Sequence, residues 1–181
     1  GLFNSAMRSL DPVLVLEHHE LDPLEGPVPK DDLDYLIPLG RADVRRSGSD
    51  LTILTYLSLV PRVLHIAEEL AGEVGIDVEV IDLRSLDYAS LDFHTINASL
   101  EKTRQAIIVE QAMETQSLVH LIAARIHERF HGKLKQPVRR LSSIPVPIPV
   151  SKVQERAVLI SDEAIRDGIL QAVSKTVSVT S

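Results

Sequence analysis

The stretch LTILTYLSLVPRVLHIAEELAGEVGIDVEVIDL, residues 51–83, decides the fold class. Its two ends, 51–56 and 78–83, are apolar runs of the kind that form strands buried on both faces of a parallel sheet. Between them, apolar residues recur at helical spacing and predict a helix over 60–73. A strand, a helix and a second strand in this order predict a right-handed crossover, which is the repeating unit of α/β folds.

The alternation of strands and helices continues toward the C-terminus. The elements expected there are a short helix over 91–100, a strand over 106–109, a helix over 117–130 that Gly132 ends, and a more polar strand over 137–141 nearer an edge. Ser161 is placed to cap a final helix whose first turn carries Asp162 and Glu163. The sequence therefore predicts an α/β fold with an open, mainly parallel sheet and helices on both faces.

The first fifty residues are organised differently. Residues 1–10 predict the end of an amphipathic helix, and Val13–Leu16 is an apolar run that predicts a strand buried on both faces. Residues 22–50 carry four prolines and an acidic cluster, which are typical of a stiff, solvated linker. We interpret them as a linker between a domain remnant, 1–21, and a main domain, 51–181. Because the chain starts without Met inside a predicted helix, we expect a cut fragment or a processed piece.

Composition restricts the function classes. The hydrophobic fraction is 44% and the aromatic fraction is 3%, so the core must be built from aliphatic side chains. The net charge is −7 and no basic stripe is present, which argues against nucleic-acid binding. The chain has no cysteine, which excludes disulfides and fits a reducing compartment, so we expect a cytoplasmic protein. No apolar run is long enough for a membrane span, and no signal peptide is visible.

Several strings, taken in order, resemble one family. They are PVLVLEH at 12–18, IPLGRADV at 37–44, DLTILTY at 50–56, VIDLRSL at 80–86, IVE at 108–110, AARI at 123–126 and PVRR at 137–140. The ordered set resembles the β subunit, or β half, of the E1 components of thiamine-diphosphate-dependent 2-oxo acid dehydrogenases of the pyruvate and branched-chain type. The most specific pair is IPLGRADV followed by VIDLRSL.

This resemblance implies roles for the pieces of the chain. Residues 1–21 would end a pyrimidine-binding domain, and 51–181 would be a transketolase-type C-terminal domain. Thiamine diphosphate and Mg²⁺ belong to the full enzyme, whose activating glutamate and active-site histidines lie upstream of Gly1. No catalytic, cofactor-binding or metal residue is therefore expected here, no cofactor is expected on this fragment, and the fragment alone should be inactive.

The resemblance also implies partners. The C-terminal domain would form a homodimer, alongside an E1 α subunit or α half and the E2 acyltransferase. The full enzyme would decarboxylate a 2-oxo acid and transfer the acyl group to the lipoyl group of E2, with the organic chemistry supplied by the cofactor.

The chain departs from the family pattern at two places. The family usually has glycine where this chain has Leu57, and a Gly-x-Gly-Ala-Glu stretch where this chain reads SLVHL at 117–121. Glycine permits tight turns and close backbone approach, so its loss puts a shared loop function in doubt. The departures indicate an outlying branch, and a chain with fused α and β halves is one alternative.

Two histidine clusters are candidate sites. His127 and His131 form an H-E-x-x-H motif with Glu128, and on a helix both could bind zinc. His120 lies on roughly the same face and Glu155 follows a proline-rich loop, but the motif falls at a helix end, which favours a solvated, charged surface. The second cluster is His18, His19 and Glu20, at the carboxyl end of the predicted strand 13–16. These three residues could border an active site, although a polar exit into the linker is the preferred interpretation.

Polar side chains also end two central strands. Arg84 ends the strand 78–83, and Glu110 and Gln111 end the strand 106–109. We expect an ion pair between Arg84 and Glu110 that serves structure or a subunit interface rather than catalysis. Glu155 is a further candidate for such an interface or ion pair.

Two loops leave alternatives open. Residues 144–149 alternate apolar residues with proline, which predicts either a rigid arm on a neighbouring subunit or a loop over its own domain. Asp31, Asp32 and Asp34 could suggest calcium, but the spacing, glycine and final glutamate of an EF-hand are absent, so a solvated loop is expected.

Three other functions compete with the dehydrogenase hypothesis. They are a free-standing interaction module, the C-terminal domain of a transketolase or deoxyxylulose-phosphate synthase, and a zinc hydrolase.

Overall fold

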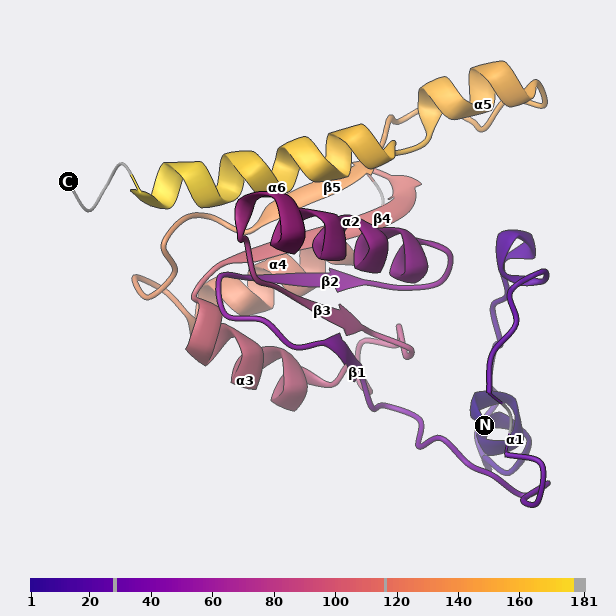
Figure 1. Cartoon of the computed structure of the whole chain (residues 1–181). Helices are drawn as coiled ribbons and strands as arrows, with labels where there is room; N and C mark the ends of the chain where they lie inside the picture. Colours follow the sequence, from indigo (N-terminus) through magenta and orange to yellow (C-terminus); the bar gives the residue numbers. More distant parts are fainter. Residues whose placement is uncertain (28, 116, 178–181) are drawn as a thin grey trace.

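The computed structural model describes residues 1–27, 29–115 and 117–177 and is shown in Figure 1. The helices are α1 Leu2–Met7, α2 Leu59–Val74, α3 Phe93–Thr103, α4 Val119–Arg129, α5 Lys152–Val158 and α6 Asp162–Val177, with a short 3₁₀ helix, η1, at His19–Leu21. The strands are β1 Asp43–Arg46, β2 Leu51–Thr55, β3 Val78–Asp82, β4 Ala106–Met113 and β5 Arg139–Ser143.

The five strands form one sheet in the order β1-β3-β2-β4-β5. β3, β2, β4 and β5 run parallel, and β1 pairs antiparallel with β3 at one edge. β2 lies at the centre, and all five of its residues are buried. The expected open and mainly parallel sheet is confirmed.

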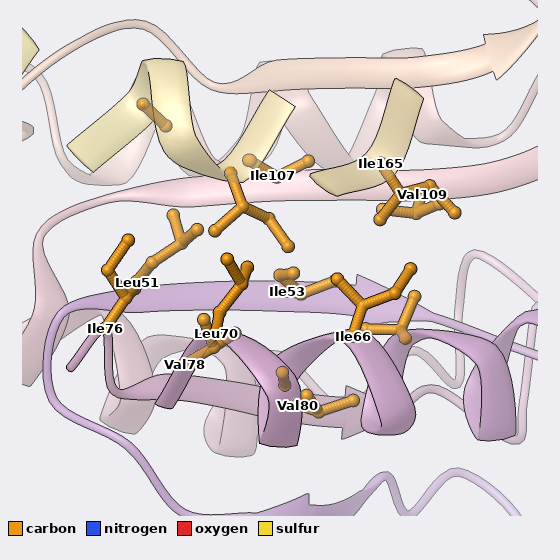
Figure 2. Packing of buried hydrophobic residues seen from close by; sticks show 14 of the residues in the cluster. Leu51, Ile53, Ile66, Leu70, Ile76, Val78, Val80, Ile107, Val109 and Ile165 are labelled. Carbon is orange, nitrogen blue, oxygen red and sulfur yellow. The ribbon is translucent and has the colours of Figure 1, made fainter. Parts of the chain in front are cut away.

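Helices cover both faces of this sheet (Figure 1). α2 and α6 pack on one face, where Ile53, Val80 and Ile107 meet the apolar sides of both helices (Figure 2). α3 and α4 pack on the opposite face around Leu54 and Ile108. Both clusters consist almost entirely of aliphatic side chains, as the low aromatic content predicts.

The helix ends follow their sequence signals. Ser161 Oγ accepts a hydrogen bond from Ala164 N at 3.1 Å, so Ser161 caps α6 as expected. Gly75 follows α2 at φ +69°, a left-handed conformation that glycine adopts without a steric penalty. No helix among the described residues is long and apolar enough to cross a membrane.

Residues 1–27 and 29–38 lie beyond the carboxyl ends of the parallel strands (Figure 1). The strand expected over Val13–Leu16 is wrong, because these residues are extended but pair with no described strand. Leu14 is 83% exposed, whereas a strand buried on both faces needs neighbours on both sides. The helix expected over 1–10 is present as the shorter α1.

Two elements were not expected from the sequence. β1 lies inside the segment 22–50 that was interpreted as a linker, so the last part of that segment belongs to the sheet. Its sequence, DVRR, is too polar to give a strand signal. α5 follows the proline-rich residues 144–149, which carry no helix or strand, and it projects from the body of the domain (Figure 1).

We predict that Arg104→Gly raises the free energy of unfolding by about 0.5 kcal/mol. Arg104 is exposed and ends α3 at φ +54°. The strain of a side chain in the left-handed region, about 1–2 kcal/mol, exceeds the entropy cost of glycine, about 0.5–1 kcal/mol. Chemical denaturation measures the change. Glu101→Gly, in the same helix, is the control and should lose about 1 kcal/mol; equal losses in both variants would contradict the prediction.

Candidate functional site

The sheet has a point where its connections run in opposite directions. From β2 the chain crosses to β3 on one side, and from β4 it crosses to β5 on the other side. The carboxyl ends of β2 and β4 therefore flank a crevice of the kind where open α/β sheets bind ligands. Tyr56 follows β2, and Glu110 and Gln111 lie in β4 at this position.

Glu110 is the most unusual group at this point, because its carboxylate is fully buried. Ser142 Oγ donates to Glu110 Oε1 at 2.8 Å, and Tyr56 OH donates to Oε2 at 3.4 Å. Ser117 Oγ also donates to Oε2. Among the described residues, no basic side chain forms an ion pair with Glu110. The carboxylate is thus satisfied by neutral hydroxyl donors, which a buried acceptor requires.

Tyr56 is held as a neutral donor beside this carboxylate. Burial, and to a smaller extent the negative charge of Glu110, raise the pKa of Tyr56 to about 12. Gln111 lies on the other side of the same strand, and Ser58 Oγ donates to Gln111 Oε1 at 3.3 Å. Hydroxyl, amide and carboxylate groups from the residues after β2, from β4, from β5 and from the turn before α4 thus gather at this point of the sheet.

The ion pair expected between Arg84 and Glu110 is wrong. Arg84 Nη2 lies 2.5 Å from Asp43 Oδ2, and Arg84 Nε lies 3.9 Å from Asp82 Oδ2. β2 separates β3 from β4, so the two strand ends that carry Arg84 and Glu110 are not neighbours. Arg84 is instead a structural link between β1 and β3.

This link is part of a set of contacts that we call the clasp, formed by Gly40, Asp43, Arg84 and Ser85. Gly40 N donates to Ser85 Oγ at 2.8 Å, next to the pairing of Arg84 with Asp43. Asp43 also faces Asp82 in the antiparallel ladder. The clasp joins the strings IPLGRADV and VIDLRSL, so these two motifs are close in space as well as ordered in sequence.

An apolar cleft lies between residues 2–24 and the carboxyl ends of the strands. Its volume is about 1050 Å³. One wall includes Val13–Leu16, and the other includes Tyr56, Leu57, Val60 and Leu86. Leu57 adopts φ +52°, a conformation that glycine tolerates more easily. The position where related sequences usually have glycine is thus one that requires a positive φ.

The cluster of His18, His19 and Glu20 lies at η1. The two histidine rings stack with centroids 5.0 Å apart, and His18 Nδ1 accepts a hydrogen bond from Glu20 N at 3.3 Å. Glu20 also lines a smaller hollow of about 320 Å³ together with Arg62 and His65. The structure does not bring this cluster together with Glu110, and its place at an active-site border stays a prediction.

His127 of the zinc-protease motif and His120, which precedes the motif in α4, have other partners. Val138 N donates to His127 Nε2 at 3.3 Å, and His120 contacts Glu114 O and Arg140. The described residues contain no group of three or more His, Cys, Asp or Glu side chains that could hold a metal ion.

The remaining candidates have local roles. Asp34 pairs with Arg8, and Asp34 N donates to Asp32 Oδ1 at 3.1 Å. These contacts fit a solvated loop that packs beside α1. Glu155 lies on α5, where its amide bonds Ser151 O at 2.8 Å, and its expected interface role stays a prediction.

Residues 40–165 match the family described as transketolase, C-terminal domain. The chain belongs to this family. In fold it is similar to a split-gene transketolase described as an inactive β4 tetramer, with a TM-score of 0.66 and 19% identity over 79% of this chain and 45% of that one.

The curated relatives give a more particular similarity. The chain is 38% identical to the pyruvate dehydrogenase E1 component subunit beta of Porphyra purpurea, over 99% of this chain and 53% of that protein. It is 41% identical to the subunit of the same name from Cyanidium caldarium, over 92% of this chain and 50% of the relative. It is 40% identical to the subunit of the same name from Bacillus subtilis, over 85% of this chain and 46% of the relative. The chain thus spans about half the length of the curated relatives it matches. The resemblance proposed from the sequence is confirmed.

We predict that Gly40→Ala lowers the free energy of unfolding by about 1 kcal/mol, because Gly40 has φ +73° and an added Cβ would lie 3.0 Å from Ser90 O. Gly26→Ala is the matched control, since an added Cβ there meets nothing within 4 Å. Denaturant titration of both variants should show a loss at position 40 alone. A Gly40→Ala protein as stable as the wild type would show that the clasp does not constrain the turn.

We predict that Tyr56 ionises at about pH 12, and that it destabilises the fold as it does so. The pKa of Tyr56 in the folded protein exceeds the ordinary value of 10.0. The contribution of neutral Tyr56 to the free energy of unfolding is therefore complete below pH 10.0 and is lost as the pH rises toward 12. Ultraviolet titration of the tyrosinates should show a late step that Tyr56→Phe removes. A titration curve that this substitution leaves unchanged at its alkaline end would contradict the prediction.

Proposed function

We propose that this chain is the C-terminal part of a 2-oxo acid dehydrogenase E1 component, as a β subunit or the β half of a fused chain. The observation that carries the proposal is the 38–41% identity to pyruvate dehydrogenase E1 β subunits over most of the chain. The full protein decarboxylates a 2-oxo acid and passes the acyl group to the lipoyl group of E2. This portion serves subunit assembly.

In this proposal residues 1–21 end a pyrimidine-binding domain, 22–50 connect it to the sheet, and 51–181 form the C-terminal domain. The conformation of Val13–Leu16 supports the division. These four residues are extended, apolar and between 40% and 83% exposed. Apolar side chains in an extended segment are favourable only when neighbouring strands or helices cover them. A sheet contributed by the rest of the full protein supplies that cover.

The exposed apolar surfaces support a role in assembly. Ile144, Ile148, Val150 and Val153 are 49%, 61%, 103% and 80% exposed, and they lie on residues 144–150 and on α5. Patches of this kind mark sites where another protein surface packs. We assign them to a homodimer formed through this domain. The E1 α subunit, or α half, and the E2 acyltransferase complete the set of partners.

Thiamine diphosphate and Mg²⁺ act in the full enzyme and not on this chain alone. When bound, the cofactor supplies the carbanion chemistry of decarboxylation. The described residues contain no carboxylate cluster for the metal, and Glu110 is enclosed by hydroxyl groups. In this proposal the chain contributes to the assembly, and the groups that react with the substrate belong to the rest of the protein.

Isolation of the native protein that contains these residues tests the proposal. An antibody against residues 51–181 should recover a protein larger than 20.0 kDa together with thiamine-diphosphate-dependent 2-oxo acid decarboxylation. The purified 181-residue chain should show no such activity. A native protein of the size of this chain, recovered without that activity, would replace the proposal by a free-standing interaction module. Decarboxylation by the 181-residue chain alone would contradict the assignment of its role.

A further inference from the structure

Glu110 is hydrogen-bonded to two segments, one that forms part of the cleft wall and one that leads into the proline-rich segment. Tyr56, which donates to one carboxylate oxygen, is part of the cleft wall. Ser142, which donates to the other oxygen at 2.8 Å, lies in β5 two residues before the proline-rich segment 144–149, which we call the arm. Because both bonds end on one carboxylate, a shift of Tyr56 acts on the same group that holds Ser142.

The ladder between β4 and β5 is interrupted at this place. Val109 faces Leu141, whereas the next pair is Met113 with Ser143. β4 thus has three residues between the two pairs and β5 has one, which makes an extended bulge. Regular backbone pairing does not fix β5 to β4 there. The hydrogen bond from Ser142 to Glu110 spans the interruption.

The arm depends on the residues that follow Ser142. Ile144 N donates to Val158 O at 3.1 Å, and Ile160 N donates to Ser143 Oγ at 3.2 Å. Ser143 O accepts from Glu114 N at 3.1 Å, on the far side of the bulge. The end of β5 therefore sets where the arm and α5 leave the domain.

We propose that Glu110 is a positioning residue that couples the cleft wall at Tyr56 to the arm through Ser142. Because the ladder is interrupted beside Ser142, no regular backbone pairing holds this residue to β4, and the Glu110 carboxylate joins it to Tyr56 at the end of β2. A molecule or domain that displaces Tyr56 in the cleft therefore also changes the mobility of the arm. The proposal concerns contacts within this chain and does not depend on the reaction of the full protein.

Hydrogen exchange in the native protein that contains this chain tests the coupling. Tyr56→Phe removes one hydroxyl and keeps the ring, so the carboxylate loses one of its donors. Exchange of the amides of Ile144 and Ile160 should rise by about 2- to 10-fold, the range expected for the loss of one hydrogen bond. Tyr88→Phe is the matched control, since the Tyr88 hydroxyl accepts a hydrogen bond from Arg125 and lies on another loop.

A double-mutant cycle separates coupling from local loosening. If Glu110 joins the two sites, Tyr56→Phe and Ser142→Ala should change exchange in the arm non-additively, by at least about twofold. Additive changes, or a Tyr56→Phe effect confined to the residues next to position 56, would overturn the proposal. Both substitutions remove only a hydroxyl group, so the test does not require a variant of the buried Glu110 itself.

Discussion

The complete burial of β2 between β3 and β4 is the constraint on which the domain depends. Every residue of β2 is enclosed, so both of its faces must be covered by helices and both of its edges by strands. α2 with α6 and α3 with α4 supply the two covers. The crossovers that bring these helices into place run in opposite directions from β2 and β4. The polar crevice at the carboxyl ends of the strands is a geometric consequence of this arrangement.

The polar groups of the domain gather where the apolar packing ends. The clasp joins β1 and β3 at the edge of the sheet, and the Glu110 cluster lies at the carboxyl ends of β2 and β4. In each case, hydrogen-bonding partners from distant parts of the chain take the place of water around a charged group. Such satisfied networks specify one arrangement of the loops, because every alternative leaves a buried polar group without a partner. They fix the loop geometry on one side of the cleft.

The sequence predicts the parts of the fold that rest on local periodicity. The runs around Ile53 and Ile107 are strands because uninterrupted apolar residues suit a doubly buried sheet, and α2 follows from its 3.6-residue spacing. The sequence carries no comparable signal for β1, whose four residues are held by backbone pairing and by Arg84. It also misleads at Val13–Leu16, where the pattern of a buried strand is present but the neighbouring strands are not.

The sequence predicts the candidate site less well, because local sequence patterns do not determine the order of the strands. Arg84 and Glu110 each end a strand, and only the position of β2 between them shows that they cannot pair. The partners of Glu110 come from positions 56, 117 and 142, and no spacing rule relates these positions. The clasp could have been found from the co-occurrence of the two motif strings, which indicates that they serve one structural purpose.

The exposed segment Val13–Leu16 has a consequence for the behaviour of the chain in solution. Its backbone amides and carbonyls form no ladder with any described strand, and its side chains are all aliphatic. Such a segment is a template on which a further strand can add, including the same segment of another molecule. Self-association through this edge would increase with protein concentration. Charged residues flank the segment at Asp11 and Glu17, and their mutual repulsion between stacked copies opposes that growth.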